Sequence, residues 1–184
     1  FRDVLRDRRL WLLLVTVIAI NITWHGYRAW LPLYLQEQRG FNEAQMSRFT
    51  TYYYLVADVG SWTVGGLTLW LCRRGVALQT SRLITYGGSA LLTTTTLLVP
   101  FLPDGWPLKV GLLLVAFGAL GLFPSYFALS QEVSARHQGK ITGTLGFAAH
   151  LSLAMIYPLE GLINDRTGSF NLVLCIVGVP PLFA

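Results

Sequence analysis

Six long stretches of this chain contain no Asp, Glu, Lys or Arg, and they constrain its fold more than any other feature. They are Leu10–Tyr27, Val59–Cys72, Leu83–Pro103, Val110–Gln131, Ile141–Leu159 and Thr167–Ala184. Most approach the roughly 20 apolar residues that cross a bilayer core as a helix, and in lipid each helix satisfies its own backbone hydrogen bonds. We therefore predict an all-α integral membrane protein with six transmembrane helices. Their expected ranges are about 10–35, 50–72, 82–102, 108–130, 141–163 and 170–184.

The low charge of the chain excludes most soluble classes. Charged residues make up 12% of the chain and hydrophobic residues 53%, whereas soluble domains carry about 25% charged residues. The net charge of +5 is spread over apolar sequence and does not indicate a nucleic-acid surface. Cys72 and Cys175 form no CxxC or zinc spacing, and the histidines form no HExxH motif. We expect a protein in the lipid bilayer that is not an enzyme, with no cofactor, metal or nucleic-acid partner.

Lys and Arg are distributed unequally between the two sides of such a bundle. One side holds nine: Arg2, Arg6, Arg8, Arg9, Arg73, Arg74, Arg82, Arg136 and Lys140. The other side holds four: Arg39, Arg48, Lys109 and Arg166. Cytoplasmic loops carry the excess of Lys and Arg. The distribution predicts cytoplasmic termini in an inner or plasma membrane.

Both ends of the chain indicate a portion of a longer membrane protein. It opens on Phe1 within a basic segment, and no signal peptide precedes that segment. The last apolar stretch ends at Ala184 after about 15 residues of predicted span, short of a full crossing. We expect further spans outside this sequence.

Polar residues inside the first span are the leading candidates for a binding site, because ionisable groups in a membrane are costly. Asn21, Trp24 and Arg28 recur at helical spacing, and His25 lies among them. Arg28 can hold a carboxylate through two parallel hydrogen bonds. Alternatively, Arg28 reaches the outer interface with its guanidinium or pairs within the bundle. For His25 the alternative is a hydrogen-bonded structural role.

Later spans add three more ionisable residues. Asp58 lies near the middle of the second span. Its candidate roles are an ion pair that changes with conformation, a structural hydrogen bond, or the carriage of a proton. His150, in the fifth span, is either a core hydrogen-bond partner or a pathway residue. Glu160 lies close to the outer end of that span, where we expect it to reach water.

Three patterns predict how the helices bend and pack. Pro124 should kink the fourth span, since proline removes a helical hydrogen bond. The run Thr93–Thr96 should be tolerated inside the third span, because threonine hydroxyls bond back to helix carbonyls. Glycines cluster within the second, fourth and fifth spans, where small residues let helix backbones approach.

Four motifs resemble one known family. Residues 58–75 (DVGSWTVGGLTLWLCRRG) resemble the eighth helix and following loop of the anion:cation symporter family, within the major facilitator superfamily. Residues 30–41, which begin WLPLYL and end RGF, resemble the seventh helix of that family. Residues 138–143 (QGKITG) resemble the start of its eleventh helix, and residues 165–170 (DRTGSF) the loop before its twelfth. The resemblance covers nearly the whole chain as the C-terminal six-helix half, residues 10–184, with residues 1–9 ending the cytoplasmic loop between the halves.

The resemblance implies a secondary transporter that works by alternating access. Relatives mostly move organic anions such as sugar acids, usually with protons, so the expected partners are an organic anion, H+ or another cation, and the N-terminal six-helix half. We expect substrate contacts from one set of residues and gating contacts from another. The substrate set is Asn21, Trp24, His25, Arg28, Ser125, Tyr126 and His150. The gating set is Asp58, Arg73, Arg74 and Arg136.

The chain also departs from the family pattern. Leu69 stands where many relatives have a gating Asp, and Gln131 stands where the tenth helix of relatives has Asp. His150 is the conspicuous polar residue of the fifth span, where relatives place an Asn. These departures leave the substrate open. Two other functions also remain: a six-helix half-transporter or channel subunit that acts as a homodimer, and a sensor that keeps the transporter fold without transport.

Overall fold

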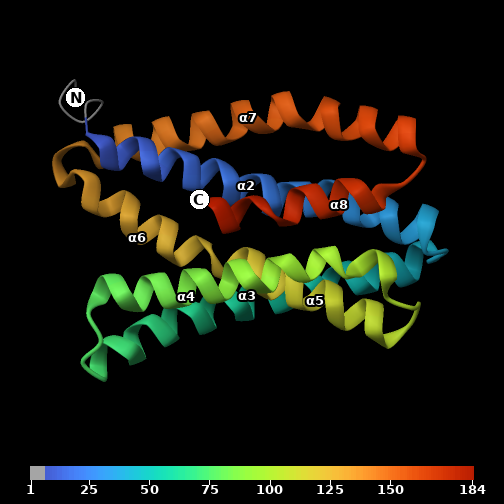
Figure 1. Ribbon diagram of the computed structural model, residues 1–184, viewed down its shortest axis with the longest axis horizontal. Helices are drawn as coiled ribbons and strands as arrows, with labels where there is room; N and C mark the ends of the chain where they lie inside the picture. The colour runs from blue at the N-terminus through green and yellow to red at the C-terminus, as the bar shows by residue number, and fades with distance from the viewer. Residues whose placement is uncertain (1–6) are drawn as a thin grey trace.

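The computed structural model describes residues 7–184, which are mostly helical and contain no strand (Figure 1). The first helix, α2 (Arg8–Leu33), begins at Asp7, whose carboxylate accepts a hydrogen bond from the Arg9 amide at 2.9 Å. The predicted interbundle loop, residues 1–9, therefore gives its last two residues to this helix. Residues 1–6, with Arg2 and Arg6 of the charge count, lie outside the described residues.

The first two helices are longer than their predicted spans. α2 continues through a π-helical turn, η1 (Tyr34–Gln38), so the first helical run is Arg8–Gln38. The second helix, α3 (Glu43–Arg73), begins at Asn42, where the Asn42 side chain and the Gln45 side chain each bind the other residue's backbone amide. This capping box starts the helix seven residues before the beginning of the predicted span 50–72.

The third predicted span is a broken helix. α4 (Leu78–Thr93) ends within the threonine run and is followed by two short 3-10 helices, η2 (Thr94–Leu97) and η3 (Val99–Phe101). The hydroxyls of Thr93, Thr94 and Thr95 donate to carbonyls three residues earlier, at 2.6–2.8 Å. The predicted back-bonding is confirmed for these three, whereas Thr96 donates to the Leu174 carbonyl of another segment. A single continuous helix over 82–102 was the wrong expectation, because the backbone tightens into the 3-10 form where Thr96 bonds to the Leu174 carbonyl and the Tyr27 hydroxyl.

The fourth predicted span breaks where its proline predicts. α5 (Trp106–Gly121) and α6 (Phe123–Val133) meet at Leu122, and Pro124 occupies the first turn of α6. Proline is tolerated there because the first turn of a helix needs no amide donor. A short 3-10 helix, η4 (Ala135–His137), then leads to the long α7 (Gln138–Thr167).

The chain ends in a short apolar helical pair. Gly168 ends α7 in the left-handed region, with φ of 62°, and reverses the chain. α8 (Phe170–Gly178) and the 3-10 helix η5 (Pro180–Phe183) follow. Thr23 of α2 donates to the Val177 carbonyl at 2.5 Å and so ties α8 to the first helix.

The helices form two groups (Figure 1). α2, α7 and α8 pack together, and α3, α4 and α5 form the second group, while α6 passes from the second group to contact α2 and α7. Glycines permit the closest approaches. A Cβ added to Gly60 of α3 would lie 2.2 Å from the carbonyl oxygen of Phe117 in α5, and one added to Gly118 would lie 2.6 Å from the Ser89 carbonyl oxygen in α4. The predicted packing role is confirmed at these two glycines.

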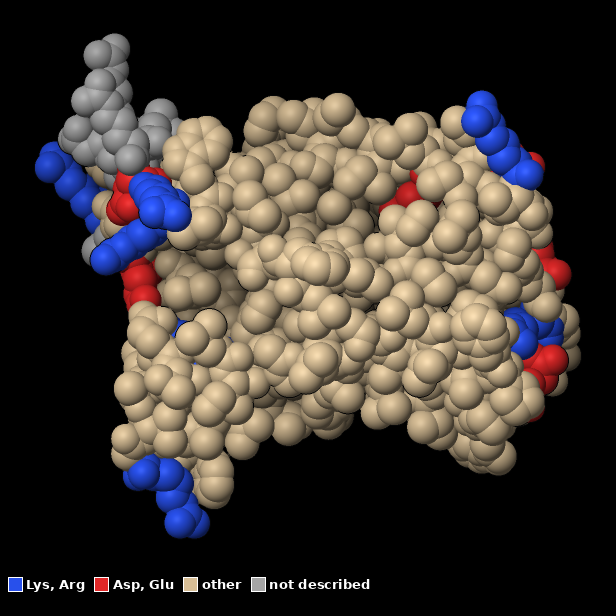
Figure 2. All heavy atoms as spheres, viewed as in Figure 1, with Lys and Arg blue, Asp and Glu red and all other residues tan. Residues whose placement is uncertain are grey.

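Four helical runs are long and apolar enough to cross a membrane: Arg8–Gln38, Glu43–Arg73, Trp106–Val133 and Gln138–Thr167. The run Phe170–Phe183 is apolar but shorter. On the face in Figure 2, nearly all charged side chains lie at the two ends of the long axis, and the belt between them carries almost no charge. Such a distribution is typical of a chain that crosses a bilayer several times. The count of six crossings and the cytoplasmic position of the termini stay predictions.

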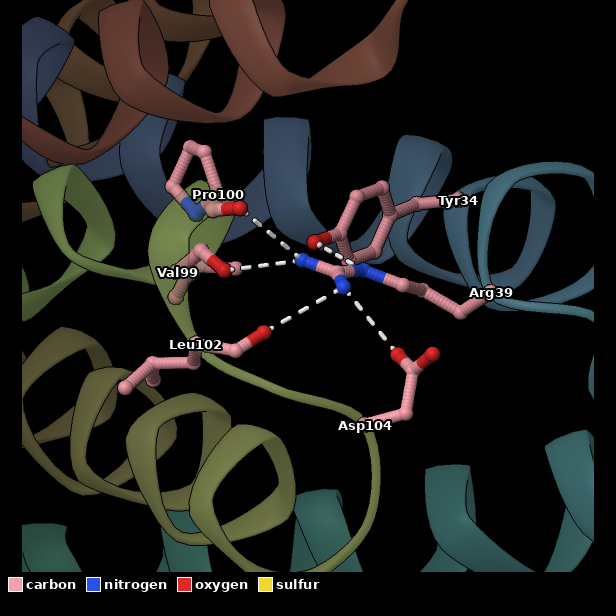
Figure 3. Close-up of polar contacts among 6 residues, drawn as sticks. All are labelled: Tyr34, Arg39, Val99, Pro100, Leu102 and Asp104. Carbon is pink, nitrogen blue, oxygen red and sulfur yellow. Dashed lines mark hydrogen bonds and ion pairs between the residues drawn. The ribbon is translucent and has the colours of Figure 1, made fainter.

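Arg39, at the end of the first helical run, binds the irregular segment after η2 (Figure 3). Its guanidinium donates to the carbonyls of Val99, Pro100 and Leu102 at 3.0–3.4 Å, and to the Tyr34 hydroxyl at 2.8 Å. It also forms an ion pair with Asp104 at 3.0 Å. Broken helices leave carbonyls without backbone partners. Arg39 supplies a donor to the Pro100 and Leu102 carbonyls and a second donor to the Val99 carbonyl, which also accepts from the Leu102 amide.

We expect Arg39→Ala to lower the free energy of unfolding by about 2 kcal/mol, because it leaves the Pro100 and Leu102 carbonyls without a donor. The Asp104 side chain is 68% exposed, so Asp104→Ala should cost less than about 1 kcal/mol. Thermal unfolding of the two purified variants in the same detergent measures the difference. Equal midpoints for both would show that the carbonyl contacts of Arg39 do not stabilise the fold.

Candidate functional site

An aromatic cluster surrounds Trp24, midway along α2. The Trp24 ring stacks on Tyr53 with a centroid distance of 6.4 Å and meets Tyr54 edge-on at 5.8 Å, both from α3. Phe123, at the start of α6, meets it edge-on at 6.4 Å. The break before Pro124 brings the start of α6 to α2 at this point. The cluster therefore joins three helices around one indole that is itself only partly buried.

Two predicted histidines meet beside this cluster. The rings of His25, on α2, and His150, on α7, lie 5.7 Å apart. His150 is exposed, and its Nδ1 contacts the Gly146 carbonyl of its own helix at 2.9 Å. The Tyr157 hydroxyl donates to the backbone carbonyl of His25 at 3.3 Å and holds the same two helices together. Residues 125 positions apart in the chain thus share one side of the α2–α7 contact.

Arg28 follows His25 by one helical turn and lies on the same face of α2. Its side chain is exposed, and no ion pair joins it to any described residue. A guanidinium in this position, beside two imidazoles and an indole, has five N–H donors available for a planar anion. This arrangement is suited to holding a carboxylate or sulfonate group.

The other predicted substrate residues are buried within this bundle. Asn21 is 6% exposed, and its amide donates to the Val17 carbonyl at 2.8 Å within α2. Ser125 and Tyr126 of α6 are 5% and 6% exposed. The Ser125 hydroxyl has no partner, and Tyr126 packs on Phe127 with a centroid distance of 4.6 Å. The structure therefore separates these three from Trp24 and His25, which are partly buried, and from Arg28 and His150, which are exposed.

The predicted gating residues are all exposed. Asp58 lies on α3, one turn beyond Tyr54, and forms no ion pair with a described residue. Arg73 and Arg74 lie at the end of α3, where the Arg74 guanidinium covers the Trp70 ring at 5.1 Å, and Arg136 lies in η4. The charge pair that this end does contain joins Arg82 of α4 to Glu132 of α6 at 2.7 Å. Sequence analysis did not predict that pair.

Sequence analysis also missed residues that the structure places at the site. Tyr54 and Phe123 form walls of the Trp24 cluster, and their signals were an aromatic run at Tyr52–Tyr54 and a position directly before a helix-breaking proline. Glu160 of α7 was expected to reach water, yet it is 2% exposed. Trp30 of α2 covers it and donates its indole N–H to Glu160 at 2.6 Å.

A separate groove of about 690 Å³ lies between the first halves of α3 and α5. Arg48, Tyr52, Trp106 and Lys109 are among its lining residues, and none of the predicted substrate residues reaches it. The Lys109 ammonium sits against the rings of Phe41 and Trp106 at 5.8 and 5.6 Å. The groove lies beside the loops at one end of the bundle, away from the candidate residues of α2 and α7.

No group of three or more His, Cys, Asp or Glu side chains within residues 7–184 is arranged to hold a metal ion. The exposed mid-span residues instead offer positive charge and aromatic surface. Positive charge and aromatic surface together can hold an organic anion by hydrogen bonds and stacking. The arrangement is suited to binding and movement of a solute.

The sequence model of the Major Facilitator Superfamily matches residues 1–158 of this chain. The chain belongs to the Major Facilitator Superfamily. Members of this superfamily are transporters, so the expectation that the chain is not an enzyme holds. The four motifs that resembled its anion:cation symporters therefore lie on a chain of the same superfamily.

Curated members of the superfamily with similar sequences carry the names of organic-anion transporters. The chain is 26% identical over 186 residues to a probable L-galactonate transporter of Escherichia coli K12, which covers 97% of the chain and 40% of the relative. It is 25% identical to the hexuronate transporter of the same organism, over 99% of the chain and 40% of the relative. A probable sulfoacetate transporter of Cupriavidus necator is 27% identical over 93% of the chain and 40% of that protein. The chain thus spans about 40% of the length of these relatives.

Proposed function

We propose that the chain is the C-terminal half of a proton-coupled symporter of organic anions, such as sugar acids. The observation that carries this proposal is the exposed guanidinium of Arg28 within the first helical run, without an ion pair to a described residue and close along α2 to Trp24 and to the His25–His150 pair. A cation in a membrane is costly unless it has a partner. An anionic substrate supplies that partner, and the names of three relatives describe anions of this class.

The N-terminal half of the same transporter is the proposed partner of the exposed faces of α3 and α7. The apolar parts of these two helices are less buried within the described chain than those of the other two long helical runs. The space beside three glycines on these helices is open: a Cβ added to Gly65 on α3, or to Gly143 or Gly146 on α7, would have no atom within 4 Å. Small residues on a membrane helix favour close packing against another helix. The same face of α7 carries His150 one turn beyond Gly146.

The proposed mechanism is alternating access between the two halves. With the anion bound to Arg28, Trp24 and Tyr54 pack on its apolar part, and the His25–His150 pair offers N–H donors. Asn21, Ser125 and Tyr126 support this wall from behind. Asp58, Arg73, Arg74 and Arg136 then exchange contacts with the N-terminal half as the cavity opens to one side or the other. We place both termini in the cytoplasm and the protein in the plasma or inner membrane.

Transport by the full-length protein in sealed proteoliposomes tests this proposal. Radiolabelled aldonates, uronates and sulfonates are supplied outside, with an imposed pH gradient that is acidic outside. We expect saturable accumulation of at least one carboxylate, abolished by a protonophore. Flux that does not saturate and survives the protonophore indicates a channel and contradicts the proposal, as does transport by this half alone.

A further inference from the structure

Glu160 is the single charged side chain that residues 7–184 bury. It lies on α7 within the span Gln138–Thr167. One carboxyl oxygen, Oε2, accepts the Trp30 indole hydrogen at 2.6 Å, while the other, Oε1, is buried without a hydrogen-bond partner. An ionised carboxylate with one neutral donor is costly in a low-dielectric interior. The surroundings of Glu160 therefore favour its neutral, protonated form.

A second buried oxygen without a donor lies one helical turn away. The amide oxygen of Asn164 is buried and has no partner. Residues four apart on a helix are neighbours, so Glu160 and Asn164 lie on the same face of α7. A carboxylate only accepts hydrogen bonds, whereas a protonated carboxyl has one O–H donor. A proton on Oε1 thus supplies an O–H donor on the face of α7 that carries both unpartnered oxygens.

The neighbouring elements offer Glu160 little compensating charge. On α2, the titratable and charged groups that face this part of α7 are His25 and Arg28, and neither forms an ion pair with Glu160. On α7 itself Tyr157 is nearby, but its hydroxyl donates to the His25 carbonyl. α8 contributes the Phe170 ring, 5.9 Å from the Trp30 ring, and its sequence contains no Asp, Glu, Lys or Arg.

We infer that Glu160 is a proton-binding site of this half and carries a proton through the transport cycle. The inference rests on the proposed symport function. In the conformation described here the carboxyl group is protonated and closed off by Trp30. When α7 moves relative to α2 and water reaches the group, the O–H bond breaks and the proton passes to water.

The variant Glu160→Gln in the full-length protein provides the first test. Glutamine keeps the shape of the protonated carboxyl, offers an N–H donor to Asn164 and cannot release a proton. We expect accumulation driven by a pH gradient to fall at least tenfold, while exchange of internal for external substrate stays within threefold of wild type. The matched control is Glu37→Gln, since Glu37 is an exposed acid in η1. It should leave both activities unchanged.

Infrared spectroscopy of the wild-type protein tests proton binding without transport. The difference between wild type and Glu160→Asp should contain the carbonyl band of a protonated carboxylic acid at neutral pH, and this band should shift in Trp30→Phe, which removes the indole donor. A Glu160 that shows only carboxylate bands at neutral pH overturns the inference. This measurement also decides the case if Glu160→Gln does not fold.

Transport outcomes separate this inference from the function on which it rests. If the Glu160→Gln variant accumulates substrate under a pH gradient as well as the wild type does, the role of Glu160 is overturned and the symport proposal stands. If transport by the wild-type protein is driven by a sodium gradient and does not depend on pH, both proton symport and the coupling role of Glu160 are overturned. In that case a protonated Glu160 in the infrared spectrum still supports proton binding at this site.

Discussion

Replacing Arg28 by alanine in the full-length transporter should lower kcat/KM for uptake of the anion by about 30- to 150-fold. The exposed guanidinium has no ion-pair partner among residues 7–184, so in our proposal it serves the substrate anion. A hydrogen bond to a charged group is worth about 2–3 kcal/mol, and each 1.4 kcal/mol changes affinity about tenfold. Initial rates of substrate exchange, measured over a range of concentrations, give the change.

Two further variants make this result specific. Arg28→Lys keeps the charge but loses the planar pair of donors, so we expect an intermediate loss. Arg166→Ala removes an exposed cation at the end of α7, outside the apolar stretch, and should not alter uptake. If Arg28→Ala transports as well as wild type, the guanidinium instead extends to the membrane interface and takes no part in substrate binding.

Gly60→Ala should strongly destabilise the fold. The new methyl group would lie 2.2 Å from the Phe117 carbonyl oxygen and 2.8 Å from the Phe117 Cα. Because both are backbone atoms, no side-chain rotation relieves the clash and α3 must move away from α5. Overpacking of this kind costs about 3 kcal/mol. We expect much less monodisperse protein after detergent extraction and a lower midpoint of thermal unfolding.

Gly88→Ala is the matched control for this prediction. Gly88 lies in α4, is exposed, and has nothing within 4 Å of an added Cβ. Alanine at that position should be neutral or slightly stabilising, because it raises helix propensity. If Gly60→Ala is as stable as Gly88→Ala, α3 and α5 do not approach as closely as the structure shows.

Local sequence signals predicted much of the fold. Pro124 placed the break of the fourth span, because proline alters the backbone wherever it occurs in a helix. The threonine run was predicted as helix, but its effect depended on a partner far away in the chain. Thr96 donates to the Leu174 carbonyl of α8 at 2.7 Å and bonds to the Tyr27 hydroxyl of α2. Such contacts fix the 3-10 geometry and cannot be read from four threonines in a row.

The candidate site was predictable to the extent that it depends on helix faces. Helical spacing placed Trp24, His25 and Arg28 together, and the structure adds His150 beside His25. Spacing alone did not reveal which residues the neighbouring helices cover. Glu160 was expected to reach water because it lies near a span end. The indole of Trp30, 130 residues earlier in the chain, covers it. Burial of this kind is a property of helix pairs.

The contacts of Arg39 also bear on the order in which the chain enters the membrane. The ribosome makes Arg39 60 residues before Val99, whose carbonyl it binds. At about 5–20 residues per second, the interval is about 3–12 s. During that interval water or lipid headgroups must satisfy the guanidinium. The segment at the end of the third predicted span then becomes stable in lipid only after it contacts Arg39, which was synthesised earlier.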